Sequence, residues 1–160
     1  MTSTNPTGLT QTLETEVTAV RRFVGLLERE QSMLIKGDID GLLELVDEKN
    51  NVAAQLTTLA RQRGERLADA GISADKRGMS VWLAEHPHEA GAHAQWGVLL
   101  SLATQARELN RLNGDLIRLR LQHNTQALEA LLGAASAPLS LYDRDGHSAH
   151  VGIRRISDRA

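Results

Sequence analysis

LLSLATQARELNRLNGDLIRLRL, residues 99–121, carries the clearest helical pattern in the chain. Leucine and alanine return every three or four residues with charged and amide side chains between them, which is the spacing of one face of an α-helix. We predict that this helix runs from about Glu89 to Leu132 and ends at Gly133. About 44 helical residues span on the order of 65 Å. The apolar sector is too broad for one helical neighbour, so we expect it to pack against two.

Two more long helices precede it, from about Thr7 to Lys36 and from about Asp38 to Ala70. Lys36-Gly37-Asp38 supplies a basic last turn, a glycine for the left-handed exit and a cap for the next helix, so these two helices form an antiparallel hairpin. Glu16 and Glu30 are assigned to the polar face of the first helix. The apolar stripes are Leu9, Leu13, Val17, Val20, Val24, Leu27 and Leu34, then Leu42, Leu45, Val46, Ala53, Leu56, Leu59, Ala60 and Leu67.

The segment from Gly71 to Pro87 is broken by glycines and contains one compact apolar group. It predicts a short helix or turn near residues 79–83 that lays Trp82 over one end of the bundle. The fold class is therefore all-α, an antiparallel bundle of three long helices plus one short helix. We place this helical bundle domain at residues 1–137 and a flexible polar tail at 138–160, where alternating residues allow at most a marginal hairpin.

The composition excludes several classes of function. The net charge is −2 and the sequence pI about 6.3, without the excess of lysine and arginine that nucleic-acid binding brings. The absence of cysteine excludes disulfides and thiolate chemistry. We find neither a secretory signal nor an apolar run of the roughly 20 residues that a membrane span needs. We therefore expect a cytoplasmic protein with no nucleic-acid partner and no membrane insertion.

Candidate sites for chemistry are weak. Glu85-His86-Pro87-His88-Glu89 with His93 offers metal-ligand atoms, but proline between the histidines is a loop feature and no second ligand-bearing helix matches it. A solvated polar turn is the better interpretation, and we predict no metal and no cofactor. His123 occupies an apolar heptad position, which predicts a partly buried, hydrogen-bonded ring. Phosphate-binding loops, nucleophile elbows and dinucleotide fingerprints are missing, so we predict a protein that is not an enzyme.

Asn113-Gly114 is a turn signal that interrupts a strong helical period. One interpretation is a local weakening or kink that the flanking leucines tolerate. The other is a polar spot where another helix or a client segment can approach the backbone closely. The sequence does not separate the two.

Several pieces follow one another along the chain: Glu30 to Leu34 leading into Gly37-Asp38, then Leu42, Leu45 and Lys49, a tryptophan (Trp82 or Trp96) before the long helix, LNRLNGDLI at residues 109–117, and LYDRDG at residues 141–146. Their order resembles the FlgN family of flagellar type III export chaperones, from about Leu13 to Ile156. The most specific part is Asn-x-x-Asn-Gly inside a helix combined with a Leu-Tyr-x-x-x-Gly tail.

The resemblance implies a cytoplasmic, non-enzymatic export chaperone. Such a protein binds the C-terminal helical segments of hook-filament junction (hook-associated) proteins and delivers them to the cytoplasmic domain of the flagellar export gate. It also implies that the last helix and the tail capture the client and that Tyr142 contacts the gate. The expected partner-binding residues are Leu109, Asn110, Asn113, Gly114, Leu116, Ile117 and Leu119 on the helix and Leu141, Tyr142 and Gly146 in the tail.

Two other functions stay open from the sequence. One is a helical coiled-coil adaptor or scaffold with no export role, which gains nothing from an accessible Tyr142. The other is a metal or signalling enzyme built in the core of a bundle, which metal content after purification would reveal. An aliphatic helical groove that receives the apolar face of a client helix is consistent with the chaperone.

Overall fold

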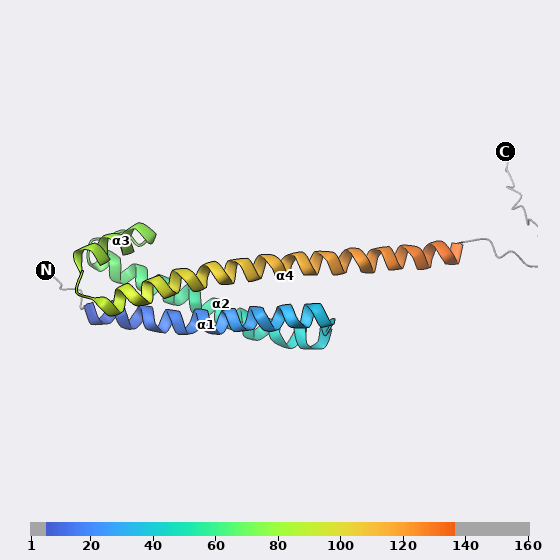
Figure 1. Cartoon of the computed structure of the whole chain (residues 1–160), viewed down its shortest axis with the longest axis horizontal. Helices are drawn as coiled ribbons and strands as arrows, with labels where there is room; N and C mark the ends of the chain where they lie inside the picture. Colours follow the sequence, from blue (N-terminus) through green and yellow to red (C-terminus); the bar gives the residue numbers. More distant parts are fainter. Residues whose placement is uncertain (1–5, 137–160) are drawn as a thin grey trace, which may run out of the picture. The chain divides into compact units, whose positions relative to one another are not determined.

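The structure is a computed structural model that describes residues 6–136, with side chains from residue 8 to residue 134. It contains four helices, α1 (Pro6–Lys36), α2 (Ile39–Asp69), α3 (Lys76–Glu85) and α4 (Ala90–Ser136), and no strand within this range (Figure 1). The prediction of three long helices and a short one is confirmed. Within the same residues, no helix is both long enough and apolar enough to cross a bilayer.

Contacts divide the chain into two units, Met1–Arg120 and Leu121–Ala160. The first unit holds α1, α2, α3 and the first part of α4. In the second unit, the described residues are the last part of α4, residues 121–136. The predicted tail, residues 138–160, lies outside the described residues, so its boundary at residue 137 stays a prediction.

The turn between α1 and α2 forms as the sequence predicts. Gly37 has φ +77°, and the N–H groups of Gly37 and Asp38 donate to the Met33 carbonyl oxygen at 2.8 and 3.0 Å. This left-handed exit ends α1. The Asp38 carboxylate then accepts a hydrogen bond from the N–H of Gly41 at 2.9 Å and caps α2. The two helices therefore pair as an antiparallel hairpin.

The short helix α3 also begins at an aspartate cap, where Asp75 accepts from the N–H of Gly78 at 2.9 Å. A Cβ on Gly78 would lie 1.6 Å from the Ser73 carbonyl oxygen, so this close approach requires glycine. Trp82 is completely buried and packs in one core cluster with Leu9 and Leu67. Because these residues come from the start of α1 and the end of α2, Trp82 closes that end of the bundle, as predicted.

The core of the first unit is aliphatic apart from two tryptophans. Its main cluster draws on all four helices and a smaller one fills the space between α1 and α2. The main cluster contains Leu9, Leu13, Val17, Val20, Val24, Leu67, Met79, Trp82, Leu83, Ala92, Trp96 and Leu99, and the smaller one contains Leu26, Leu45 and Val52. Burial of these side chains supplies the main stabilisation, roughly 1.5–3 kcal/mol for each large one.

Two details of the predicted helices are wrong. Val46 was assigned to the buried stripe of α2, but it is 45% exposed and Val52 is buried in its place. Val52 lies seven residues after Leu45 and seven before Leu59, so the true stripe follows a heptad. Gly133 does not end α4, which continues to Ser136. One glycine costs a helix only about 1 kcal/mol, whereas Pro138 disfavours helical geometry at the residue before it.

Candidate functional site

Asn113 lies at the centre of the predicted site and is 1% exposed. Its side-chain Nδ2 donates to the Leu27 carbonyl oxygen at 2.9 Å and to Glu30 Oε2 at 2.8 Å. Glu30 also accepts from Lys49 Nζ at 2.5 Å. A buried polar network therefore joins α4, α1 and α2, and it fixes which residues of the three helices face one another.

The Asn113-Gly114 motif does not interrupt α4, which is helical throughout this region. A Cβ built on Gly114 meets no heavy atom within 4 Å, so the chain itself makes no close approach to the backbone there. Asn113 contacts the protein's own α1, while Asn110 is exposed. Leu109 and Leu116 are half-buried against the bundle. Whether a partner approaches Gly114 stays a prediction.

The apolar face of α4 changes from half-buried to exposed along the helix. Ile117 and Leu119 are 42% and 49% exposed, and every side chain from Leu121 to Ala134 is exposed. In the second unit, the exposed large apolar side chains have exposed fractions between 57% and 70%, and we name them the α4 stripe: Leu121, Leu128, Leu131 and Leu132. Leu121, Leu128 and Leu131 are spaced by seven and three residues, which places them on one helix face.

Residues 121–134 belong to the second unit, so their predicted packing against two neighbours stays a prediction. His123 is exposed rather than partly buried. The leucines of the α4 stripe are exposed as well. A helix surface of this kind is chemically suited to receive another apolar surface.

Arg120 ties α4 to the end of α1. Its Nε donates to the Leu34 carbonyl oxygen at 2.5 Å and its Nη2 to the Ile35 carbonyl oxygen at 3.1 Å. These carbonyls belong to the last turn of α1, where no helical N–H remains to bond them and where a cation is favoured. Arg120 thus supplies a C-terminal cap from another helix.

A groove of about 380 Å³ lies where α1, α2 and α4 meet in the first unit. Most of its lining is apolar, but Glu16 and Arg63 form a buried ion pair there, with Nε to Oε2 at 3.1 Å. The guanidinium of Arg63 also lies 5.1 Å from the centre of the Trp96 ring, a cation–π contact. Burial raises the pKa of Glu16, and the charge of Arg63 opposes that rise.

Glu16 and Glu30 do not lie on the polar face of α1, so their predicted position is wrong. Both carboxylates are at least 90% buried. Their spacing from the apolar residues of α1 could have predicted that they are buried. Glu16 lies three residues after Leu13 and four before Val20, and Glu30 has the same spacing to Leu27 and Leu34. A charged residue in the apolar phase of a helix is buried with a partner.

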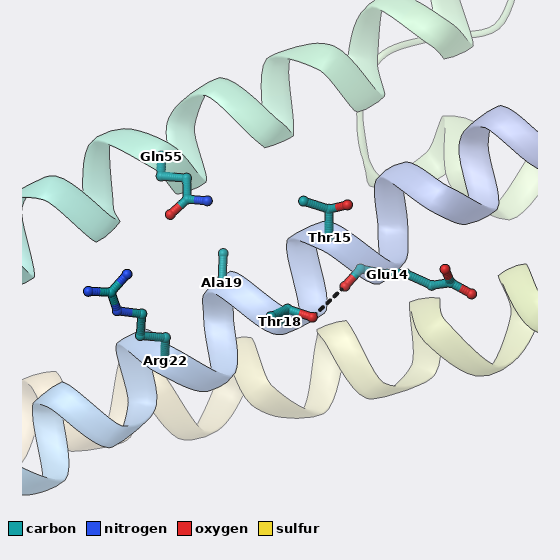
Figure 2. Close-up of a pocket in the computed structure, with 6 residues that line it drawn as sticks. All are labelled: Glu14, Thr15, Thr18, Ala19, Arg22 and Gln55. Carbon is teal, nitrogen blue, oxygen red and sulfur yellow. Dashed lines mark hydrogen bonds between the residues drawn. The ribbon is translucent and has the colours of Figure 1, made fainter.

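A second depression, of about 370 Å³, lies between α1 and α2 (Figure 2). Its lining is small or polar, with Thr15, Thr18 and Ala19 of α1 facing Gln55 of α2. Thr18 Oγ1 donates to the Glu14 carbonyl oxygen at 3.0 Å. Arg22, at the edge, is paired with Glu48 at 3.1 Å. Thr15 Oγ1 likewise donates to the Gln11 carbonyl oxygen at 2.9 Å, so both threonine hydroxyls are hydrogen-bonded within α1.

The histidine-rich segment after α3 is structural in the part that the structure describes. The ring of His86 stacks on Trp82 with centroids 4.1 Å apart, and its Nδ1 lies 2.8 Å from the Trp82 carbonyl oxygen. His93 Nε2 lies 3.3 Å from the His86 carbonyl oxygen. Across the described residues, no three imidazole or carboxylate side chains gather as a metal site. Leu141, Tyr142 and Gly146 lie outside the described residues.

Comparison with known proteins identifies the family of this chain. A family model described as FlgN protein matches residues 1–150. Proteins named flagella synthesis protein FlgN are similar to this chain. That of Proteus mirabilis is 29% identical over 142 residues, covering 88% of this chain and 89% of the relative. That of Yersinia enterocolitica is 31% identical over 125 residues, covering 77% of each.

A solved structure is similar as well. The crystal structure of a protein from Pseudomonas aeruginosa, titled as a flagella synthesis protein of the FlgN type, matches with a TM-score of 0.63 and 25% identity. The match covers 80% of this chain and 97% of that chain.

Proposed function

Because the chain belongs to the FlgN family and is a flagella synthesis protein, we propose that it is a cytoplasmic chaperone of flagellar export. It binds hook-associated proteins, the proteins of the hook-filament junction, through their C-terminal helical segments. It then delivers them to the cytoplasmic domain of the flagellar type III export gate. The observation that carries this proposal is the α4 stripe.

The α4 stripe has the chemistry of a receiving surface for an amphipathic helix. Its leucines recur at helical spacing and are uncovered within the described residues, which is unusual for apolar side chains of this size. A client segment that is unfolded on its own gains buried apolar area on binding, which offsets the entropy lost when the segment orders.

The same geometry supports a binding protein rather than an enzyme. The buried carboxylates Glu16 and Glu30 are neutralised by Arg63 and Lys49. Each of these ion pairs joins α1 to α2. A catalytic role for the first unit has no support from its described residues.

Co-purification from the native host tests the proposal. The tagged full-length chain should recover one or more hook-associated proteins. The double variant Leu128→Ser/Leu131→Ser should lose them, because both side chains belong to the α4 stripe. A matched control, Gln122→Ser/Gln126→Ser, changes exposed polar residues of the same helix segment and should recover them normally. If neither the unmodified chain nor the Gln122→Ser/Gln126→Ser control recovers any flagellar protein, the proposal fails.

A helical adaptor with no export role is the second candidate, since an uncovered α4 stripe suits it equally. The adaptor differs in one respect: it needs no contact with the export gate. Binding of the chain to the gate's cytoplasmic domain therefore separates the two.

A further inference from the structure

We propose that the first three turns of α2 form a second partner-binding surface, which takes a basic amphipathic helix of another protein. We name this surface the acidic α2 face. It consists of the aliphatic row Ile39, Leu43 and Val46 and the flanking carboxylates Asp40, Glu44 and Asp47.

The aliphatic row faces away from the bundle. Ile39, Leu43 and Val46 are 58%, 67% and 45% exposed, and their spacing of four and three residues places them on one helix face. Leu45, on the opposite side of α2, is buried between α1 and α2. Ile35, in the last turn of α1 just before the hairpin turn, is 66% exposed and adds to the apolar surface near this end of the hairpin.

The three carboxylates lie along one flank of that row, since each follows a row residue by one position. None of them forms a hydrogen bond or ion pair through its side chain with the described residues. Their neighbour Glu48, by contrast, is bound by Arg22 and Arg29. In this part of α2, the unpaired carboxylates therefore lie on the side that faces away from the bundle.

Helix capping explains part of this charge. Asp38 is the cap of α2, and Asp40 lies in its first turn, where a carboxylate is favoured by the helix dipole. Glu44 and Asp47 lie beyond the first turn and have no such local role. Residues 35–47 contain four carboxylates and one base, Lys36, so the local field around the aliphatic row is negative.

This arrangement defines the chemistry of the occupant. An aliphatic row with acids on one flank complements a helix whose apolar stripe is flanked by lysine or arginine. A second copy of this chain bound through the same face would bring carboxylates against carboxylates, which is unfavourable. In the α4 stripe region, residues 121–134 contain a single acid, Glu129, so a basic helix should prefer α2.

The probe is a synthetic amphipathic helical peptide with leucine on one face and lysine on the others, with a glutamate-for-lysine twin. We expect the full-length chain to bind the lysine peptide in a fluorescence anisotropy titration and to bind the glutamate peptide at least about tenfold more weakly. Glu44→Lys/Asp47→Lys should reverse that preference. Leu43→Ser should weaken lysine-peptide binding several-fold. Asp40 is left unchanged because it stabilises the start of α2.

The control is Leu128→Ser/Leu131→Ser, which alters the α4 stripe and should bind the lysine peptide as the unmodified chain does. Circular dichroism should show all variants folded, because every changed side chain is at least partly exposed. The proposal is overturned if the α2 substitutions leave both affinities unchanged or if the α4 control removes the binding. It is also overturned if the α2 substitutions abolish self-association of the chain without affecting peptide binding, since the occupant is then a second copy.

Discussion

At the scale of single residues, the bundle is organised by polar side chains that occupy apolar positions. Asn113, Glu30 and Lys49 connect α4, α1 and α2, and Glu16 with Arg63 forms a second such link. Leucine stripes alone allow helices to slide by a heptad, because each stripe looks the same one repeat later. Buried hydrogen bonds remove that freedom, since only one register satisfies them.

Asn113→Ala should lower the free energy of unfolding by about 1–3 kcal/mol, because it leaves the buried Glu30 without one of its hydrogen-bond donors. The matched control is Asn110→Ala on the same helix, whose exposed side chain should change stability by less than about 0.5 kcal/mol. Urea unfolding followed by circular dichroism measures both. Equal stability of the two variants would show that the network contributes nothing.

Glu16 predicts a dependence of stability on pH. Burial raises its pKa in the folded state above the ordinary value of 4.5, with Arg63 opposing. A raised pKa means that the folded chain binds the proton more tightly than the unfolded chain does. The contribution of Glu16 to stability is therefore full below pH 4.5 and is lost as the pH rises through the folded-state pKa.

The comparison with Glu16→Gln isolates this contribution, because other carboxylates titrate alike in both proteins. The unfolding free energy of the unmodified chain minus that of the variant should fall as the pH rises from about 4 and then level off. A difference that grows with pH would mean that Arg63, rather than burial, decides the ionisation of Glu16.

The sequence predicted the apolar side chains of this core but not its buried polar pairs. The apolar spacing of α1 predicted its leucines that pack, but charge assigned Glu16 and Glu30 to the surface. Arg63 lies four residues from both Leu59 and Leu67, and Asn113 lies between Leu109 and Leu116, so all four polar residues are in the apolar phase. Their spacing from the neighbouring apolar residues could therefore have predicted that these four side chains face the core. Which partners they bind depends on how the three helices pack, and the hydrophobic period of a single helix does not specify that packing.

At the scale of the helices, the hairpin turn was predictable from the sequence, whereas the end of α4 and the exposure of several side chains were not. Caps act within a few residues, so Gly37-Asp38 identified the hairpin turn correctly. Val46 is exposed because it faces away from the bundle, and this depends on how α1 packs on α2 rather than on the hydrophobic period of α2 alone. The exposed leucines of α4 continue past Leu119, the last helical residue named for the expected partner-binding site, and the site itself stays a prediction.

Gly114→Ala tests whether a partner needs the backbone of α4. The position is helical and has room for a methyl group, so the change should raise the free energy of unfolding by about 0.5–1 kcal/mol. Gly37→Ala is the contrasting variant and should destabilise the chain, since Gly37 has φ +77°. Thermal or urea unfolding measures both. If Gly114→Ala weakens client binding while stabilising the fold, the client approaches the backbone at that position.

At the scale of the whole molecule, the protein contains a folded bundle and exposed apolar helix surfaces, which we propose bind other proteins. Its own buried core stabilises the first unit, and the side chains of the α4 stripe are exposed. Under the proposed function, capture and delivery involve different parts of the chain. We propose that the α4 stripe binds the client, and the resemblance implies that Tyr142 contacts the export gate.

Tyr142→Ala should leave the melting temperature and client affinity nearly unchanged while weakening binding to the gate's cytoplasmic domain by about 1–3 kcal/mol, the usual contribution of an aromatic interface anchor. Surface plasmon resonance with the immobilised gate domain measures the affinity. Unchanged gate affinity together with a lower melting temperature would instead make Tyr142 a residue that stabilises the fold.

Isothermal titration calorimetry measures whether the α4 stripe binds the client. The titrant is the C-terminal segment of the host's hook-associated protein, and the cell holds the full-length chain. We predict measurable binding to the unmodified chain and to Leu43→Ser. We predict at least about tenfold weaker binding to Leu128→Ser/Leu131→Ser, from two lost apolar contacts of roughly 1 kcal/mol or more each. Unmodified affinity in the Leu128→Ser/Leu131→Ser variant would contradict the account.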